Sequence, residues 1–216
     1  SNWWQIVSEQ SYFEMMNRPP LLQHLWSLAI EEQFYFFWPL VLLVTVRYGG
    51  TKGVLWMASA LALITSFYMF VLAVRHNIPF EAEPNRLYLG ADTHTSGLFA
   101  GAMLACLWNP WRMNFQVQKA YISTVFSVFG VLGLLVLCAL FSWANETQAW
   151  LHRGGFLGVA FATACVIMGA TYRGGYLEKA LSLPMMRYLG ERSYGLYLWH
   201  WPIFVLIRPQ DFVIHE

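Results

Sequence analysis

The stretch from His24 to Pro39 places chemically versatile side chains directly before a long apolar run. His24, Ser27, Glu31 and Tyr35 follow the i, i+3, i+7, i+11 spacing that puts side chains on one stripe of a helix. They offer an imidazole, a hydroxyl, a carboxylate and a phenol. At a membrane boundary such a stripe is costly unless it faces water, a partner or a substrate.

Two interpretations of the acidic pair Glu31 and Glu32 stay open at this point. The pair could lie solvated among lipid headgroups, beside an aromatic belt made of Trp26, Phe34, Tyr35 and Trp38. Alternatively, the pair borders a water-filled chamber sunk into the bilayer from outside and shared with Asp92 or His200. We expect the second arrangement, with Glu31 in the pocket. Glu32 points about 100° away and has a solvated or structural role.

The elements that position these residues are those of a membrane protein. Of the 216 residues, 57% are hydrophobic and only 12% are charged, and the mean hydropathy is +0.44. A net charge of +1 without any basic block gives no sign of nucleic-acid binding. The histidines are scattered and no cluster has metal-ligand spacing, so no metal site is expected. We predict an all-α, polytopic membrane helix bundle.

Six segments are candidates to span the bilayer. Residues 54–74 and 121–143 are long enough and free of charged side chains. Shorter candidates are 34–46, extended back to about residue 25, then 96–108, 156–172 and 193–207. Turn residues such as Gly49-Gly50 and Asn109-Pro110 separate them. We therefore expect an extracytoplasmic lead-in over residues 1–24 and a transmembrane bundle over residues 25–207.

Charges between these segments predict the orientation. Residues 47–53, 109–120 and 173–192 carry eight Lys or Arg and two acids, whereas the alternate segments carry five Lys or Arg and ten acids. By the positive-inside rule the first set is cytoplasmic. This topology places His24, Glu31, Glu32, Asp92 and His94 on the extracytoplasmic side of the cell (inner or plasma) membrane.

Three segments, in this order, resemble motifs of one protein family. They are HLWSLAIEEQFYFFWPLVLL from residue 24, YLGADTHTSGLFAGAMLA from residue 88 and LGERSYGLYLWHWPIFVL from residue 189. The chain is similar to the acyltransferase-three family of integral membrane acyltransferases, which includes O-antigen, exopolysaccharide and peptidoglycan O-acetyltransferases. The resemblance implies transfer of an acyl group from a cytoplasmic acyl-CoA to a hydroxyl of an extracytoplasmic glycan or lipid-linked sugar. Acetyl is the expected acyl group, with acetyl-CoA as its donor.

The resemblance also implies which residues form the site. We expect Glu31 and His24 to be catalytic, with Glu31 orienting a base or holding a sugar hydroxyl and His24 as a second possible base. Substrate-binding candidates from the three motifs are Trp26, Ser27, Gln33, Tyr35, Asp92, His94, Ser193, Tyr194 and His200. Ser27 is expected to form hydrogen bonds rather than to act as a nucleophile, since no Asp follows to complete a triad with His24.

The chain departs from the family pattern in two places. His94 stands where many members carry Arg, and a neutral imidazole lacks the bidentate fork of a guanidinium. The Arg and His that members carry in their first membrane helix have no counterpart in this chain. We therefore expect an internal part of a single acyltransferase domain, without its first helices and its last one, and we expect the isolated 216-residue chain to be inactive.

Other functions remain possible from the sequence. The intramembrane His and Glu residues would also suit a transporter or flippase, and the altered segment from Asp92 to Ser96 would suit a catalytically inactive relative that binds a glycan. No bound cofactor is expected. Any acyl-CoA would be held by cytoplasmic side chains, of which the candidates are Arg47, Lys52, Arg112 and Arg187, because the chain has no Gly-rich phosphate loop.

Overall fold

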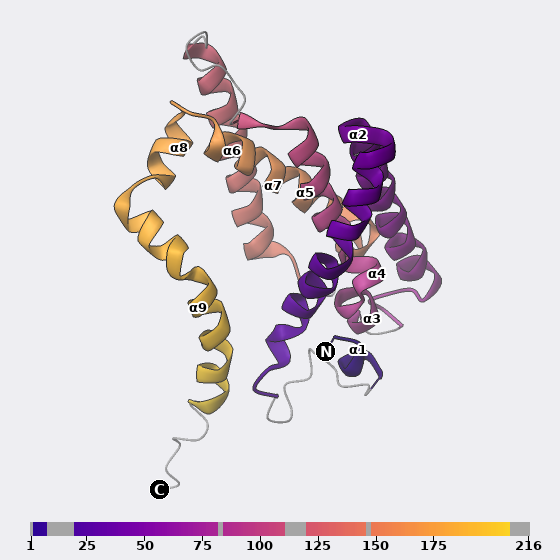
Figure 1. Ribbon diagram of the computed structural model, residues 1–216. Helices are drawn as coiled ribbons and strands as arrows, with labels where there is room; N and C mark the ends of the chain where they lie inside the picture. Colours follow the sequence, from indigo (N-terminus) through magenta and orange to yellow (C-terminus); the bar gives the residue numbers. More distant parts are fainter. Residues whose placement is uncertain (1, 8–19, 82–83, 111–119, 146–147, 208–216) are drawn as a thin grey trace, which may run out of the picture.

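A computed structural model describes residues 2–7, 20–81, 84–110, 120–145 and 148–207. Every regular element within these ranges is a helix, which confirms the predicted all-α class (Figure 1). Arg112, and part of the lead-in expected over residues 1–24, lie outside the described residues.

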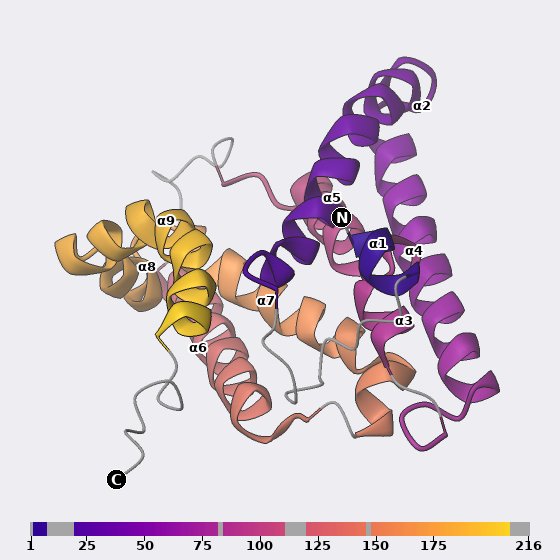
Figure 2. The same ribbon diagram turned by 90° about the horizontal axis from the view of Figure 1, so that it is seen from below.

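The longest element, α2 (Trp26–Arg75), follows a short 3-10 turn, η1 (Gln23–Leu25). It is bent back on itself at Gly50, whose φ of 58° and ψ of −161° are accessible to glycine and strained for other residues. Figures 1 and 2 show that the two arms meet at one end of the molecule and spread apart away from it. The arms coincide with the first two predicted membrane segments, and the turn lies at the expected Gly49-Gly50 pair.

Short helices gather at the opposite end of the α2 hairpin, near its beginning. They are α1 (Asn2–Val7), α3 (Asn85–Leu89) and α4 (Ala91–His94). The last of them leads into α5 (Ser96–Leu107), which packs against α2 (Figure 1). Asn2 is fully buried, and its amide donates to the carbonyl of Leu89 at 3.0 Å. A small core of Trp26, Ile30 and Leu89 holds this end together.

The next helices form a second packed unit: α6 (Ala120–Trp143), the π-helical turn η4 (Leu151–Gly155), α7 (Phe156–Thr171) and α8 (Tyr176–Leu181). Glycines let α6 and α7 touch. A Cβ on Gly133 would lie 2.7 Å from the carbonyl oxygen of Ala162, and one on Gly130 would lie 3.0 Å from Cα of Gly169. Close helix approach of this kind is how membrane helices gain packing energy without a hydrophobic driving force.

The small residues of α5 do not make a similar contact. Gly97, Gly101 and Ala105 have the four-residue spacing that allows close helix packing in membranes. All three are exposed, and a Cβ on Gly97 or Gly101 would meet nothing within 4 Å among the described residues.

The last helix, α9 (Pro184–Leu206), is largely exposed and begins beside α8. Its C-terminal half runs alongside the beginning of α2 (Figures 1 and 2). There the indole nitrogen of Trp201 donates to the carbonyl of Pro20 at 3.0 Å, and Val205 is buried. The predicted membrane segment at residues 193–207 is thus helical, although the helix begins nine residues earlier.

Three helices in the described residues are long and apolar enough to cross a membrane: Gln23–Arg75, Tyr121–Trp143 and Leu151–Thr171. The first of these includes both arms of the α2 hairpin. The shorter α5, with 12 residues, and α9, which carries Arg187, Glu191 and Arg192, are not among them. The chain is a membrane protein, and the count of six spans stays a prediction.

Candidate active site

The beginning of α2 and the middle of α9 meet around a polar pocket with a volume of about 350 Å³. We call it the serine pocket, and its lining is Ser27, Leu28, Glu31, Ser193, Tyr194 and Tyr197. Ser27 and Glu31 lie one turn apart on α2, so both face the same side. The pocket therefore brings together residues of the first and the last sequence motif, more than 160 positions apart.

A chain of hydrogen bonds closes one wall of the serine pocket. The hydroxyl of Tyr197 donates to the backbone carbonyl of His24 at 2.7 Å, and its oxygen lies 2.6 Å from Oγ of Ser27. Across the pocket, the hydroxyl of Ser193 donates to the carbonyl of Gly190 in its own helix at 2.8 Å. The first of these links fixes α9 to the beginning of α2.

His24 lies behind this wall and does not line the serine pocket. Its ring packs edge to face against Tyr197 and His200, each with ring centroids 5.3 Å away. The side chain is 4% exposed, and neither ring nitrogen makes a hydrogen bond of good geometry in the described residues. The ring lies near the backbone of Leu198. Pro202, four residues later in α9, has no N–H to donate to the Leu198 carbonyl, so that carbonyl lacks its usual helical partner.

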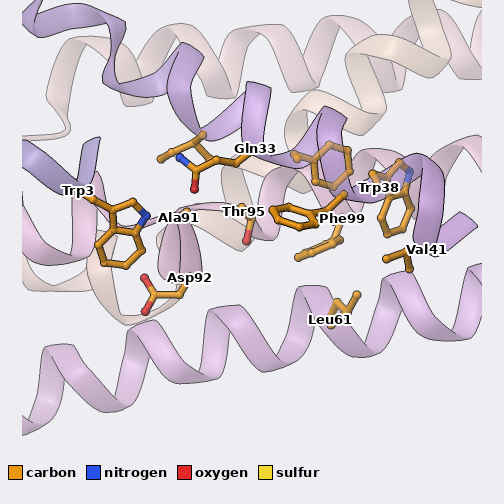
Figure 3. A pocket seen from close by; sticks show the side chains of 12 residues that line it. Trp3, Gln33, Trp38, Val41, Leu61, Ala91, Asp92, Thr95 and Phe99 are labelled. Carbon is orange, nitrogen blue, oxygen red and sulfur yellow. The ribbon is translucent and has the colours of Figure 1, made fainter. Parts of the chain in front are cut away.

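The opposite face of the same α2 arm borders a second cavity, which we call the aromatic pocket. Its volume is about 370 Å³, and it lies between the two arms of α2, α4 and α5 (Figure 3). Trp3, Gln33, Asp92 and Thr95 gather at one end, whereas the other end is apolar. The apolar lining comprises Ile30, Phe34, Phe37, Trp38, Val41, Leu61, Ala91 and Phe99.

The polar end of the aromatic pocket contains an ion pair. The guanidinium of Arg86 donates to both carboxylate oxygens of Asp92, at 2.9 and 2.5 Å, and its carbon lies 5.5 Å from the ring centroid of Trp3. The hydrogen bonds to Asp92 raise the pKa of Arg86. Asp92 is therefore held by a bidentate pair, the strongest geometry for a carboxylate and an arginine.

His94 is enclosed by aromatic rings and lines neither of these pockets. Its ring centroid lies 5.2 Å from Trp26, 5.5 Å from Tyr88 and 5.4 Å from Phe156. Burial lowers the pKa of His94 from 6.5 to about 4, because the charged form would lose its hydration. At neutral pH His94 is an uncharged packing group at the junction of α2, α3 and α7.

The remaining predicted residues are placed apart. Trp26 is buried against Tyr88, with centroids 4.6 Å apart, and Tyr35 is 60% exposed. His200 borders a third pocket, on α9, and its Nδ1 lies 2.6 Å from the carbonyl oxygen of Tyr197. The structure thus divides the expected chamber: Glu31, Asp92 and His200 border three separate pockets, and Glu32 is exposed.

Sequence reasoning missed three residues that shape these sites. Arg86 stands six positions before Asp92, and a charged residue that close to a motif carboxylate was the available signal. Tyr197 was matched to the late motif without receiving a role. Asn2, which accepts a hydrogen bond from Gln33 at 2.9 Å, gave no signal, because nothing in its neighbourhood predicts contact with α2.

The comparison with family models defines the class of the protein. The family model described as "Acyltransferase domain" matches residues 1–214, and the chain belongs to this acyltransferase-three family.

Among curated proteins, the chain is similar to peptidoglycan O-acetyltransferase OatA of Listeria monocytogenes, with 37% identity over 210 residues, which is 97% of this chain and 33% of that protein. It is 35% identical over 208 residues to O-acetyltransferase OatA of Staphylococcus aureus, which covers 96% of this chain and 33% of that protein. The chain thus spans about a third of the length of these relatives. No solved structure matches it.

Proposed function

We propose that the protein containing this chain transfers an acyl group, with acetyl as the expected one, to a hydroxyl of a glycan outside the cell. The observation that carries this proposal is the serine pocket, where Glu31 and Ser27 of the first motif meet Ser193 and Tyr194 of the last. The family and the O-acetyltransferase names of the relatives support the reaction class. A cell-wall glycan is the acceptor that the name of the Listeria relative favours.

The chemistry assigned to the serine pocket follows from its side chains. A sugar hydroxyl becomes a nucleophile when a base takes its proton, and a candidate base must lie within hydrogen-bond reach of that hydroxyl. Glu31 provides the carboxylate that lines the pocket. It accepts the proton directly or orients the group that does. His24 does not line the pocket and would act indirectly, because its ring is packed behind Tyr197.

The acyl donor is proposed to be an acyl-CoA on the cytoplasmic side. Arg47 and Lys52 flank the Gly50 turn and are exposed, at the end of the α2 hairpin away from α3 and α4 (Figure 1). Arg187, also exposed, lies near the beginning of α9. With the positive-inside orientation, the protein is a multi-pass protein of the cell membrane whose hydroxyl acceptor enters from outside.

The guanidinium that the resemblance expects at position 94 is supplied from elsewhere in this chain. Arg86 pairs with Asp92 at the polar end of the aromatic pocket. The replacement of Arg by His94 therefore leaves a cation beside the motif carboxylate. This supports an active enzyme over a glycan-binding relative without activity.

The test compares two neighbouring carboxylates in the full-length protein. Glu31→Gln keeps the shape of the side chain but removes the base, and we expect acetyl esters on the surface glycan to fall by about 10²-fold, the scale of a general base contribution. Glu32→Gln is the matched control, because Glu32 is exposed and borders none of the three pockets, and it should retain ester formation.

Either of two results would contradict the proposal. Unchanged ester formation in Glu31→Gln would remove Glu31 from the reaction. If Glu31→Gln instead lost uptake of a solute and kept its acetyl esters, the protein would be a transporter.

A further inference from the structure

Hydrogen-bond direction in the serine pocket can be deduced from the chemistry of its partners. A backbone carbonyl only accepts, so the single hydroxyl hydrogen of Tyr197 is donated to the carbonyl of His24, 2.7 Å away. At the 2.6 Å contact with Ser27, the phenol oxygen must then be the acceptor and Ser27 the donor. The only hydrogen of the Ser27 hydroxyl is therefore used on Tyr197.

Other lining groups are limited in the same way. The hydroxyl hydrogen of Ser193 is donated to the carbonyl of Gly190 at 2.8 Å, and the carboxylate of Glu31 offers acceptor oxygens. Tyr194 is the one lining side chain whose hydroxyl hydrogen is not committed by these bonds. No Lys or Arg is found among the described residues that line the pocket.

We infer that Tyr197 makes the part of the serine pocket formed by Ser27, Glu31 and Ser193 an acceptor-only wall, which selects uncharged, hydroxyl-bearing sugar groups and rejects phosphate and carboxylate groups. A sugar hydroxyl can donate to Ser27 and Ser193, whereas a phosphate or carboxylate oxygen would face lone pairs and the negative Glu31. Tyr197 is thus a specificity-determining residue that acts through Ser27. This inference rests on the proposed function for its substrate class and goes beyond it in naming the group that the pocket recognises.

The inference also separates the two substrates of the proposed reaction. The phosphates of an acyl-CoA find only one uncommitted side-chain donor in the serine pocket, the hydroxyl of Tyr194, so we assign that pocket to the acceptor alone. A single uncommitted donor on Tyr194 cannot offset a neighbouring carboxylate for an anionic ligand, since like charges at short range disfavour binding.

The experiment measures equilibrium binding of two matched probes to the full-length protein in lipid nanodiscs, without any acyl donor. The probes are N-acetylglucosamine and N-acetylglucosamine 6-phosphate, which differ by one phosphate on one hydroxyl. We expect the neutral sugar to bind about tenfold more tightly or better, the scale of hydrogen bonds lost to a charged group.

Tyr197→Phe releases the Ser27 hydrogen, so Ser27 can donate, and the preference for the neutral sugar should fall about threefold or more. Tyr188→Phe is the control. Tyr188 lies on the same helix, is 56% exposed and borders none of the three pockets, so the preference should stay at its original value. If Tyr197→Phe fails to fold, Ser27→Ala replaces it and should weaken binding of the neutral sugar without improving binding of the phosphate.

Equal or tighter binding of the phosphate by the unchanged protein would overturn the inference, and so would an unaltered preference in Tyr197→Phe. Failure of the proposed function looks different. If the unchanged full-length protein preferred the neutral sugar but transferred no acetyl group, the proposed acyl transfer would be refuted. The inference about the acceptor-only wall would still stand.

Discussion

The serine pocket and the aromatic pocket use opposite faces of one helix arm. Glu31 borders the first and Gln33 the second, and two residues along a helix turn a side chain through about 200°. The serine pocket offers hydrogen-bond acceptors, whereas the aromatic pocket is apolar except at one end. A single motif therefore supplies two surfaces of different chemistry, and its adjacent residues need not share a role.

The two pockets also differ in how they are assembled. The aromatic pocket is closed by segments that follow one another along the chain, from α2 through α4 to α5, with Trp3 of α1 added at its polar end. The serine pocket requires α9, which is joined to the beginning of α2 by contacts such as that between Ser27 and Tyr197. The first pocket therefore needs only elements close to the hairpin in sequence, whereas the second needs the packing of α9 against α2.

The largest expected effect would break both pockets together. His94 packs against Trp26, at the beginning of the arm that they share. Its pKa is about 4 in the folded protein and 6.5 otherwise, so the unfolded chain binds the proton at higher pH. The stabilisation by the neutral ring is complete above pH 6.5 and is lost as pH falls towards 4, and it amounts to about 3 kcal/mol.

This loss is measured as the free energy of unfolding of the full-length protein between pH 7 and pH 4. Because carboxylates titrate in the same range, the comparison is with His94→Phe, which keeps an aromatic ring and cannot take a proton. The variant should lose less stability on acidification. Identical pH dependence in both proteins would show that His94 is already solvated in the folded state.

A middle-sized effect should separate the two pockets. Asn2→Ala removes a fully buried amide and leaves the Leu89 carbonyl and one hydrogen of the Gln33 amide without their partners, at a cost of about 2 kcal/mol. Unfolding in denaturant measures the cost. Since α1 also carries Trp3, the aromatic pocket should open while the sugar preference of the serine pocket stays constant. A change in that preference would mean that the pockets are coupled.

The smallest effect concerns the ion pair alone. Arg86→Lys keeps the charge but loses the bidentate fork to Asp92, and both side chains are more than a third exposed (37% and 36%). Stability should therefore fall by less than about 1 kcal/mol. Arg86→Ala is the companion variant in the same thermal unfolding assay. If Arg86→Lys and Arg86→Ala lose the same stability, the positive charge at position 86 makes no measurable contribution to stability.

Much of the helical framework follows from the sequence. Uncharged apolar runs predict α6 and α7, and the Gly49-Gly50 pair predicts the turn in α2, because both signals are local. The family motifs likewise predict that Ser27 and Glu31 belong with Ser193 and Tyr194, and the structure brings these four residues together. Their roles in the reaction stay predictions.

The remaining features depend on contacts that local patterns do not encode. The stripe from His24 to Tyr35 assumes one continuous helix, but His24 lies in the 3-10 turn before α2 and its ring is directed to α9. Asp92 shares the membrane side predicted for Glu31 but is captured by Arg86. Charge patterns fix the side of a membrane on which a residue lies, whereas a shared cavity requires knowledge of tertiary packing.

The tight reversal at Gly50 has a consequence for biosynthesis. Only a few residues separate the arms of α2, so no translocated domain can form between them. Each arm is also too apolar to remain exposed to water while the other inserts. We expect the insertion machinery to receive both arms as one unit, with Arg47 and Lys52 retained at the cytosolic surface. A lengthened linker at this position would let the arms enter separately and lose their pairing.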